Sequence, residues 1–173
     1  MDFIKEFVIP FGGLKIGIHH FDFEIDDQFF EHFKYSEIKK GKVTVHLKME
    51  KEEKMLLLKF SLEGNVRVPC DRCYEPVDIR INGDESLIVK PGDGYYEESE
   101  EIQIIPEGDT QLDISPFLYE YVHLLLPVRR THPEDENGKS LCNPEIVKRI
   151  DEISTSLEPD PRWEILKKLK TKN

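Results

Sequence analysis

The sequence predicts an α+β fold built on a mainly antiparallel sheet or partly closed barrel of about six to eight strands. Between residues 14 and 104, apolar residues alternate with polar ones in several short segments, which is the period of half-buried strands. Residues 115–126 instead repeat their apolar positions at helical spacing, and two short amphipathic segments follow. We therefore expect one central amphipathic helix and two short C-terminal helices.

The first segments predict a bent strand and a short helix. Residues 14–25 alternate with a shift of one at His19 and His20, which predicts a long strand with a bulge there. Residues 26–33 begin with two aspartates and then place phenylalanines on one side, as in a short helix with an N-terminal cap.

An antiparallel meander is expected next. Residues 42–50 and 56–62 each carry alternating apolar side chains and flank the charged turn 51–54, which is the pattern of a hairpin. We expect Gly64 and Asn65 to interrupt the chain before the strand that leads to residue 69.

Turns and loops dominate the expected structure from residue 82 to residue 108. Residues 82–84 predict a turn, and residues 91–101 are rich in glycine and acid, which predicts a mobile acidic loop. Residues 87–89 and 102–104 are short apolar runs and predict strands.

The expected helices have readable ends. Ser115 is predicted to cap the central helix, which Pro127 stops. Asn143 is the expected cap of a second helix over 143–153. The segment 159–173 predicts a C-terminal helix with a basic tail.

Cys70 and Cys73 are expected at the tip of a hairpin, because Pro69 and Pro76 bracket them and alternating strands flank both prolines. Two cysteines at this spacing supply half of a tetrahedral zinc site.

The second half of the site is predicted to come from His132 and Cys142, which follow the central helix. Three thiolates and one imidazole form a closed structural zinc site. Two alternatives remain open: the cysteines are reduced residues with His132 on the surface, or Cys70 and Cys73 are a redox dithiol. The strand expected after the cysteine pair disfavours the redox alternative, because a thioredoxin-like pair precedes a helix.

Four segments together resemble the YceD-like family, the large ribosomal RNA subunit accumulation proteins. They are Cys-Asp-Arg-Cys at 70–73, Leu-Leu-Leu-Pro-Val at 124–128, the loop with Cys142, and Asp-Pro-Arg-Trp-Glu-Ile-Leu-Lys-Lys-Leu at 160–169. Many relatives have a second cysteine pair in that loop, where this chain has His132 and Cys142. The resemblance implies a bacterial, cytoplasmic, non-catalytic factor in ribosome biogenesis, whose partner is rRNA or a large-subunit ribosomal protein.

Composition narrows the function further. A chain of 173 residues predicts a single domain over 1–173, and it has neither a long apolar run nor an export signal at its start. We find no phosphate-binding loop, no zinc-protease motif and no nucleophile elbow, so we expect no enzyme and no small-molecule substrate. We also expect no membrane partner.

The net charge of −11 opposes unspecific attraction to nucleic acid, so any RNA contact requires a local basic surface. Five arginines are candidates for binding RNA or a partner: Arg67, Arg72, Arg80, Arg129 and Arg130. In the alternative interpretation they pair with neighbouring acids, namely Asp71, Asp78, Glu134 and Asp135. A zinc-stabilised protein interaction module unrelated to ribosomes is the alternative function.

Overall fold

The computed structural model describes residues 3–156 of the chain. Its internal contacts divide the chain into two compact units, one made of Met1–Pro69 and Pro76–Arg130 and the other of Cys70–Glu75 and Thr131–Asn173. The predicted C-terminal helix at 160–169 and its basic tail lie outside the described residues. The single domain that the sequence predicts stays a prediction.

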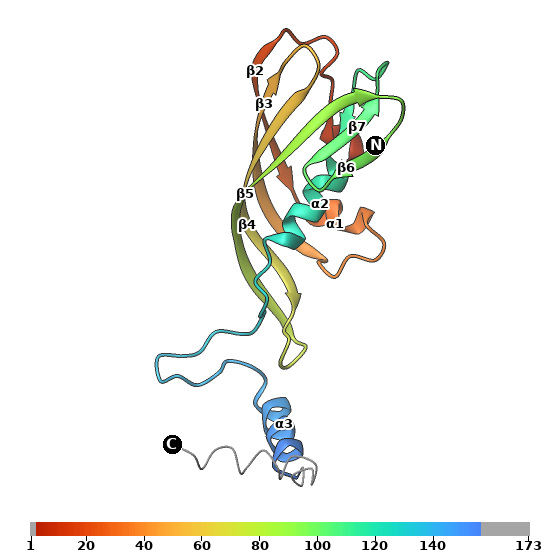
Figure 1. Cartoon of the computed structure of the whole chain (residues 1–173). Coiled ribbons are helices and arrows are strands. Elements are labelled where there is room, and N and C mark those ends of the chain that lie inside the picture. The colour runs from red at the N-terminus through yellow and green to blue at the C-terminus, as the bar shows by residue number, and fades with distance from the viewer. Residues whose placement is uncertain (1–2, 157–173) are drawn as a thin grey trace, which may run out of the picture. The chain divides into compact units, whose positions relative to one another are not determined.

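A six-stranded sheet forms most of the first unit (Figure 1). Its strands, in spatial order, are β2 (Gly17–Ile25), β3 (Lys40–Lys51), β4 (Leu56–Pro69), β5 (Pro76–Gly92), β7 (Ile102–Pro106) and β6 (Tyr96–Ser99). Neighbouring strands run antiparallel except for the parallel pair of β5 and β7. The α+β class and the meander are therefore confirmed. The sheet does not close into a barrel, because β2 and β6 are its two separate edges.

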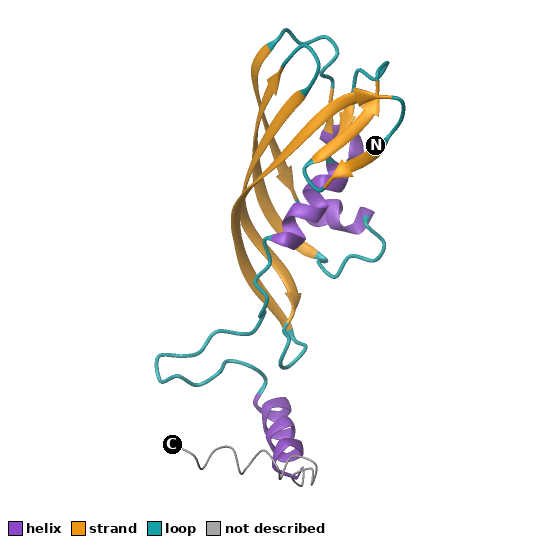
Figure 2. Cartoon of the chain, in the orientation of Figure 1, coloured by secondary structure: helices purple, strands orange, loops and turns teal. Residues whose placement is uncertain are grey.

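Short elements complete the first unit. Strands β1 (Val8–Ile9) and β8 (Leu112–Asp113) pair with each other, and a 3₁₀ turn, η1 (Phe3–Phe7), precedes them. Helices α1 (Asp27–His32) and α2 (Ser115–Leu124) lie on the same face of the sheet (Figure 2). No helix in the range 3–156 is long and apolar enough to cross a membrane.

The helix caps agree with the sequence at α1 and differ at α2. Asp26 accepts hydrogen bonds from the backbone N–H groups of Gln28 and Phe29 at 2.9 and 3.2 Å, so the predicted cap is confirmed. The Ser115 cap is wrong. Ser115 is the first helical residue, and Asp113 Oδ1 accepts its N–H at 2.9 Å.

The core of the first unit lies between the sheet and α2. The apolar side chains of β3 predicted to share a face are all buried, as are three residues of the α2 stripe: Val43, Val45, Leu47, Met49, Leu118, Tyr121 and Val122. The rings of Tyr121 and Phe60 of β4 lie 5.3 Å apart. Each fully buried Leu or Val side chain contributes about 1.5–3 kcal/mol, so this stripe fixes α2 on the sheet.

The interruptions predicted at Gly64 and at residues 82–84 are wrong, because β4 and β5 continue through both places with Gly64 opposite Ile81 and Gly83 opposite Leu62. Both positions require glycine because neighbouring atoms lie too close to the backbone for a side chain. A Cβ atom at Gly83 would lie 2.2 Å from Leu125 Cδ2, and one at Gly64 would lie 2.2 Å from the carbonyl oxygen of Lys42.

The bulge predicted at His19 and His20 is also wrong. Both residues pair in continuous register with β3, opposite Met49 and Lys48. The apparent shift in alternation arises at Ile18, which lies on an edge strand and leaves 53% of its surface exposed. An edge strand tolerates an exposed apolar residue where a central strand would bury it.

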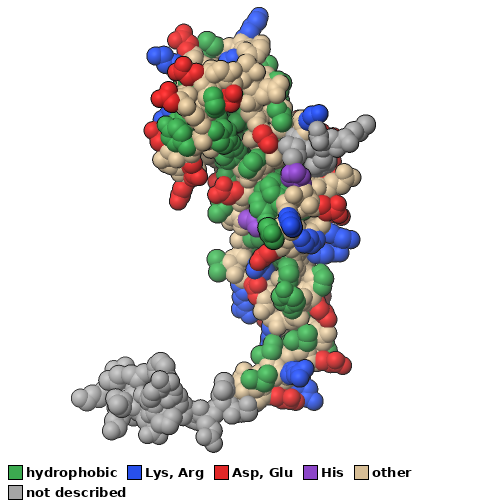
Figure 3. Space-filling view, turned by 90° about the vertical axis from the view of Figure 1, so that its right-hand side faces the viewer, with side chains coloured by type: hydrophobic (Ala, Val, Ile, Leu, Met, Phe, Trp, Pro, Cys, Tyr) green, Lys and Arg blue, Asp and Glu red, His purple; other side chains and the backbone are tan. Residues whose placement is uncertain are grey.

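The acidic segment 91–101 is not wholly a loop. It contains β6, which pairs antiparallel with β7 and is exposed along its whole length. The face in Figure 3 carries many acidic side chains in its upper part, at the height of β6 and β7 in Figure 1. The mobility predicted for this segment stays a prediction.

Candidate metal centre

The turn Cys70–Glu75 follows β4 and precedes β5, where Pro69 and Pro76 form the last pair between the two strands. The Cys70 N–H donates to the Glu75 carbonyl, and the Tyr74 N–H donates to the Cys70 carbonyl, each at 2.9 Å. Both bonds close the turn, so the chain reverses within a few residues and Cys70 and Cys73 face the same point. The predicted hairpin tip is present.

The other two candidate ligands are brought together by the loop that they flank. Leu141 donates its N–H to the Pro133 carbonyl at 3.0 Å, and Gly138 reverses the chain between them with a positive φ of 75°. Because Pro133 and Leu141 are paired, their neighbours His132 and Cys142 lie side by side, with Nδ1 and Sγ 3.8 Å apart.

All four predicted ligands meet within the second unit. Cys70 Sγ lies 3.7 Å from Cys142 Sγ, and Cys73 Sγ lies 3.4 Å from His132 Nδ1. The four ligand atoms are within 4.8 Å of one another. In a tetrahedral site with Zn–S bonds of about 2.3 Å and Zn–N bonds of about 2.0 Å, two sulfurs lie about 3.8 Å apart and a sulfur and a nitrogen about 3.5 Å apart. The separations of 3.7, 3.4 and 3.8 Å lie within about 0.3 Å of these values, so the cluster could hold a metal ion.

The thiols have unequal acidities. Burial acts to raise the pKa of Cys70, but the backbone N–H groups of Cys73 and Arg72 outweigh it and lower the pKa to about 6. Burial raises the pKa of Cys73. The Ser140 hydroxyl lowers the pKa of Cys142. Part of the thiolate character that a metal requires is therefore present before binding.

Supporting contacts orient the ligands. The Arg72 N–H donates to Cys70 Sγ at 3.4 Å, and the Cys142 N–H donates to Ser140 Oγ at 3.2 Å. Asn143 Nδ2 donates to Glu75 Oε1 at 2.6 Å, which joins the turn to the loop. Outer contacts of this kind fix ligand orientation in metal sites. Sequence reasoning missed the roles of Ser140 and Glu75, because only their position next to the ligands could have indicated them.

Helix α3 (Pro144–Ser156) begins directly after the last ligand. Asn143 Oδ1 accepts the N–H of Glu145 at 3.0 Å, which is the capping interaction predicted for this helix. The cap fixes the start of α3 next to Cys142. Asn143 therefore serves both the helix and the turn.

The five candidate arginines are divided between the units. Arg72 belongs to the second unit, and the other four belong to the first. Three of these four make ion pairs within the first unit: Arg67 donates to both oxygens of Asp78 at 2.7 and 2.9 Å, Arg80 to Glu63 at 2.6 Å, and Arg130 to Glu37 at 3.0 Å. The predicted pairing with Asp78 is confirmed. The role of the arginines in binding stays a prediction.

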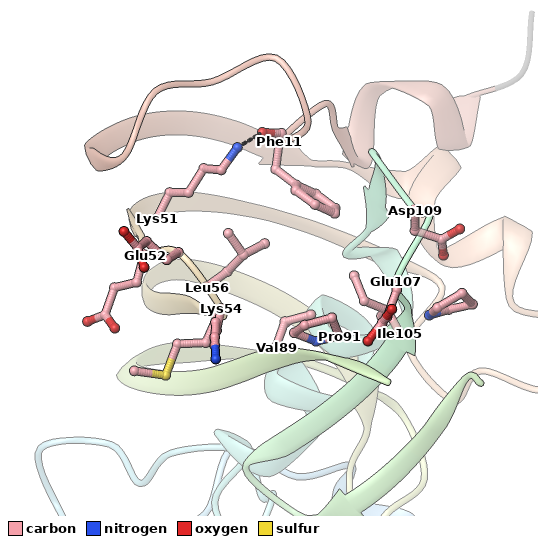
Figure 4. A pocket seen from close by; sticks show the side chains of 13 residues that line it. Phe11, Lys51, Glu52, Lys54, Leu56, Val89, Pro91, Ile105, Glu107 and Asp109 are labelled. Carbon is pink, nitrogen blue, oxygen red and sulfur yellow. Dashed lines mark hydrogen bonds between the residues drawn. The ribbon is translucent and has the colours of Figure 1, made fainter. Parts of the chain in front are cut away.

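A cavity of about 190 Å³ in the first unit is a weaker site candidate (Figure 4). It is smaller than the roughly 300–1,000 Å³ of typical ligand pockets. Lys51 at its rim donates to the carbonyl oxygens of Phe11 and Leu14 at 2.8 Å, and to that of Gly12 at 3.4 Å. The ammonium group therefore holds the loop that follows β1, and we assign this cavity a structural role.

Comparison with known proteins identifies a family. The family model described as large ribosomal RNA subunit accumulation protein YceD matches residues 58–170, a range that contains all four candidate ligands, α2 and α3. No curated protein and no solved structure matches the chain.

Proposed function

Because this chain belongs to the YceD family of large ribosomal RNA subunit accumulation proteins, we propose that it is a cytoplasmic, non-catalytic factor that supports the accumulation of large-subunit rRNA. It acts by binding rRNA or a large-subunit ribosomal protein. The family gives the biological process, and the geometry of the second unit supports the mode of action.

The main support for a non-catalytic role is the closed set of four candidate ligands. Cys70, Cys73, His132 and Cys142 supply four protein ligands, and the three cysteines are buried. Catalytic zinc sites keep a coordination position for water or substrate, whereas structural sites are filled by four protein ligands. Three sulfurs and one nitrogen favour zinc over cations that prefer oxygen ligands. Zinc bound there would stabilise the turn and the loop.

The charge of the chain limits how it binds. The net charge of −11 repels phosphate at long range, and ion pairs already engage Arg67, Arg80 and Arg130. Binding therefore uses a small local surface, and the second unit offers one that the metal ligands hold in place.

The function is tested by deleting the gene and restoring it as wild type, as Cys73→Ser or as His46→Ala. His46 is an exposed histidine that binds Asp22 at 2.6 Å outside the metal centre, so it is a matched control for loss of a side chain. The measurement is the ratio of mature large-subunit to small-subunit rRNA, together with unprocessed precursor. We expect the ratio to fall in the deletion and in Cys73→Ser, and to recover with His46→Ala.

Two other outcomes would change the assignment. A normal rRNA ratio in the deletion strain would refute the ribosomal function and leave an interaction module unrelated to ribosomes. Full recovery by Cys73→Ser would show that the function does not depend on the metal centre.

A further inference from the structure

The turn between the first two ligands carries a tyrosine on an unfavourable backbone. Tyr74 has a φ of 62° and is the sole residue other than glycine with a positive φ in the described range. A side chain in this left-handed region meets the backbone, and glycine adopts the same conformation without that penalty. The turn therefore retains a bulky residue where glycine would be easier to accommodate.

Packing of the Tyr74 ring does not offset this backbone strain. It leaves 83% of its surface exposed, and its side chain makes no hydrogen bond or ring contact with a residue in the described range. Two tyrosines of α2 behave differently: Tyr119 stacks on Phe33 at 4.0 Å and Tyr121 packs on Phe60 at 5.3 Å. Strain that the fold does not require is a reason to look for a binding role.

The backbone that carries the ring is held in place by the turn. The Tyr74 N–H is bonded to the Cys70 carbonyl, and the preceding residue, Cys73, is a candidate metal ligand. An exposed aromatic ring on an immobilised turn binds a partner with little loss of conformational freedom.

The charges of the turn favour a cationic partner. Glu75 is exposed, and its carboxylate is oriented by a neutral amide, that of Asn143, so its charge is not compensated by that contact. Arg72 is half-buried and lines a hollow of about 500 Å³ together with Lys148 and Asp151 of α3. Glu75 therefore presents a negative charge directly beside the exposed ring.

We propose that Tyr74, with Glu75, is a docking point for an arginine or lysine side chain of a basic protein segment. The cation lies over the ring face, and the adjacent Glu75 carboxylate attracts it. This inference rests on the proposed function and specifies its partner as a basic protein rather than rRNA, because an exposed carboxylate beside the ring repels phosphate.

The test uses the full chain and two probes, the peptide Gly-Arg-Gly-Arg-Gly and a short oligouridylate. Ring resonances of Tyr74 are followed by nuclear magnetic resonance during each titration, and thermal unfolding is measured for Tyr74→Gly, Tyr74→Phe and Tyr35→Gly. Tyr35 is the matched control, since it is 87% exposed and lies in the first unit without a positive φ.

We expect the peptide to shift the Tyr74 resonances and Tyr74→Gly to weaken its binding about two- to five-fold, the range of an exposed cation–π contact. Tyr74→Gly should also unfold at the same or a higher temperature, because it relieves the strained backbone. Tyr74→Phe should retain wild-type affinity, and Tyr35→Gly should leave the affinity unchanged.

Three results would overturn the inference. A lowered unfolding temperature for Tyr74→Gly would make the ring structural. Tyr74 resonances that respond to oligouridylate and not to the peptide would assign an RNA base as partner. Equal affinities of wild type and Tyr74→Gly for the peptide would show that the ring does not contribute to binding. The titrations report on the docking point alone, whereas rRNA levels in the deletion strain report on the ribosomal function alone. Failure of one is therefore distinguishable from failure of the other.

Discussion

Removing one candidate ligand should weaken metal binding by an amount that follows from the geometry. The four ligand atoms lie within 4.8 Å of one another, and the cysteines Cys70, Cys73 and Cys142 are buried. Structural zinc sites of this kind contribute about 10–16 kcal/mol of apparent binding free energy. Four comparable ligands give about 2.5–4 kcal/mol each, so His132→Ala should raise the zinc Kd about 10²–10³-fold.

The assay is competition with a chromophoric chelator, with Co²⁺ as a spectroscopic probe of tetrahedral sulfur and nitrogen coordination. His46→Ala is the matched control, because it removes an imidazole whose partner is Asp22 and should leave the Kd unchanged. In hydrogen exchange, zinc removal should expose the amides of Cys70–Glu75 and leave those of β3 protected, because β3 belongs to the core of the first unit.

The metal centre would be refuted if wild-type protein, purified without chelator, contained no zinc and gave no tetrahedral Co²⁺ spectrum. Equal Kd values for wild type and His132→Ala would show that the metal is bound elsewhere. Loss of β3 protection on zinc removal would show that the core of the first unit depends on the metal.

Two further predictions concern the sheet and the pH dependence of the site. Gly83→Ala should destabilise the protein by about 1–3 kcal/mol in chemical denaturation through overpacking against Leu125, and Leu125→Ala in the same chain should recover part of that loss. Gly13→Ala, where the new Cβ meets nothing within 4 Å, is the control. Zinc affinity should rise with pH through neutrality, because the raised pKa of Cys73 keeps its thiol protonated until a metal displaces the proton. Affinity should fall more steeply below about pH 6, where Cys70 also takes up a proton; a pH-independent Kd from pH 6 to 9 would contradict this.

The sequence predicted those parts of the fold in which side-chain burial decides the structure. Alternation on β3 and β4 placed the buried residues Val43 to Met49 correctly, because a strand with one buried face admits no other register. The interruptions predicted at Gly64 and Gly83 were wrong, since the role of these glycines depends on Lys42 and Leu125, which lie far away in the sequence. The parallel pairing of β5 with β7 was not predictable either, because it depends on β5 continuing to Gly92.

The metal ligands were predictable for a different reason. Only a few residue types bind zinc, so Cys70, Cys73, His132 and Cys142 could be selected by chemistry without knowledge of the fold. Their convergence required the backbone bond between Leu141 and Pro133, which the loop sequence does not specify in an obvious way.

The second unit is where the evidence for function accumulates. The arginines that suggested a basic surface are engaged by acids at Arg67, Arg80 and Arg130, whereas the turn of the second unit presents Tyr74 exposed and strained. A fold under selection for stability alone would place glycine there, because its cost in this conformation is lower by about 1–2 kcal/mol. A metal bound by the ligands beside Tyr74 would offset the cost of its strained backbone. Such a metal would therefore both stabilise the turn and keep the Tyr74 ring exposed for a partner.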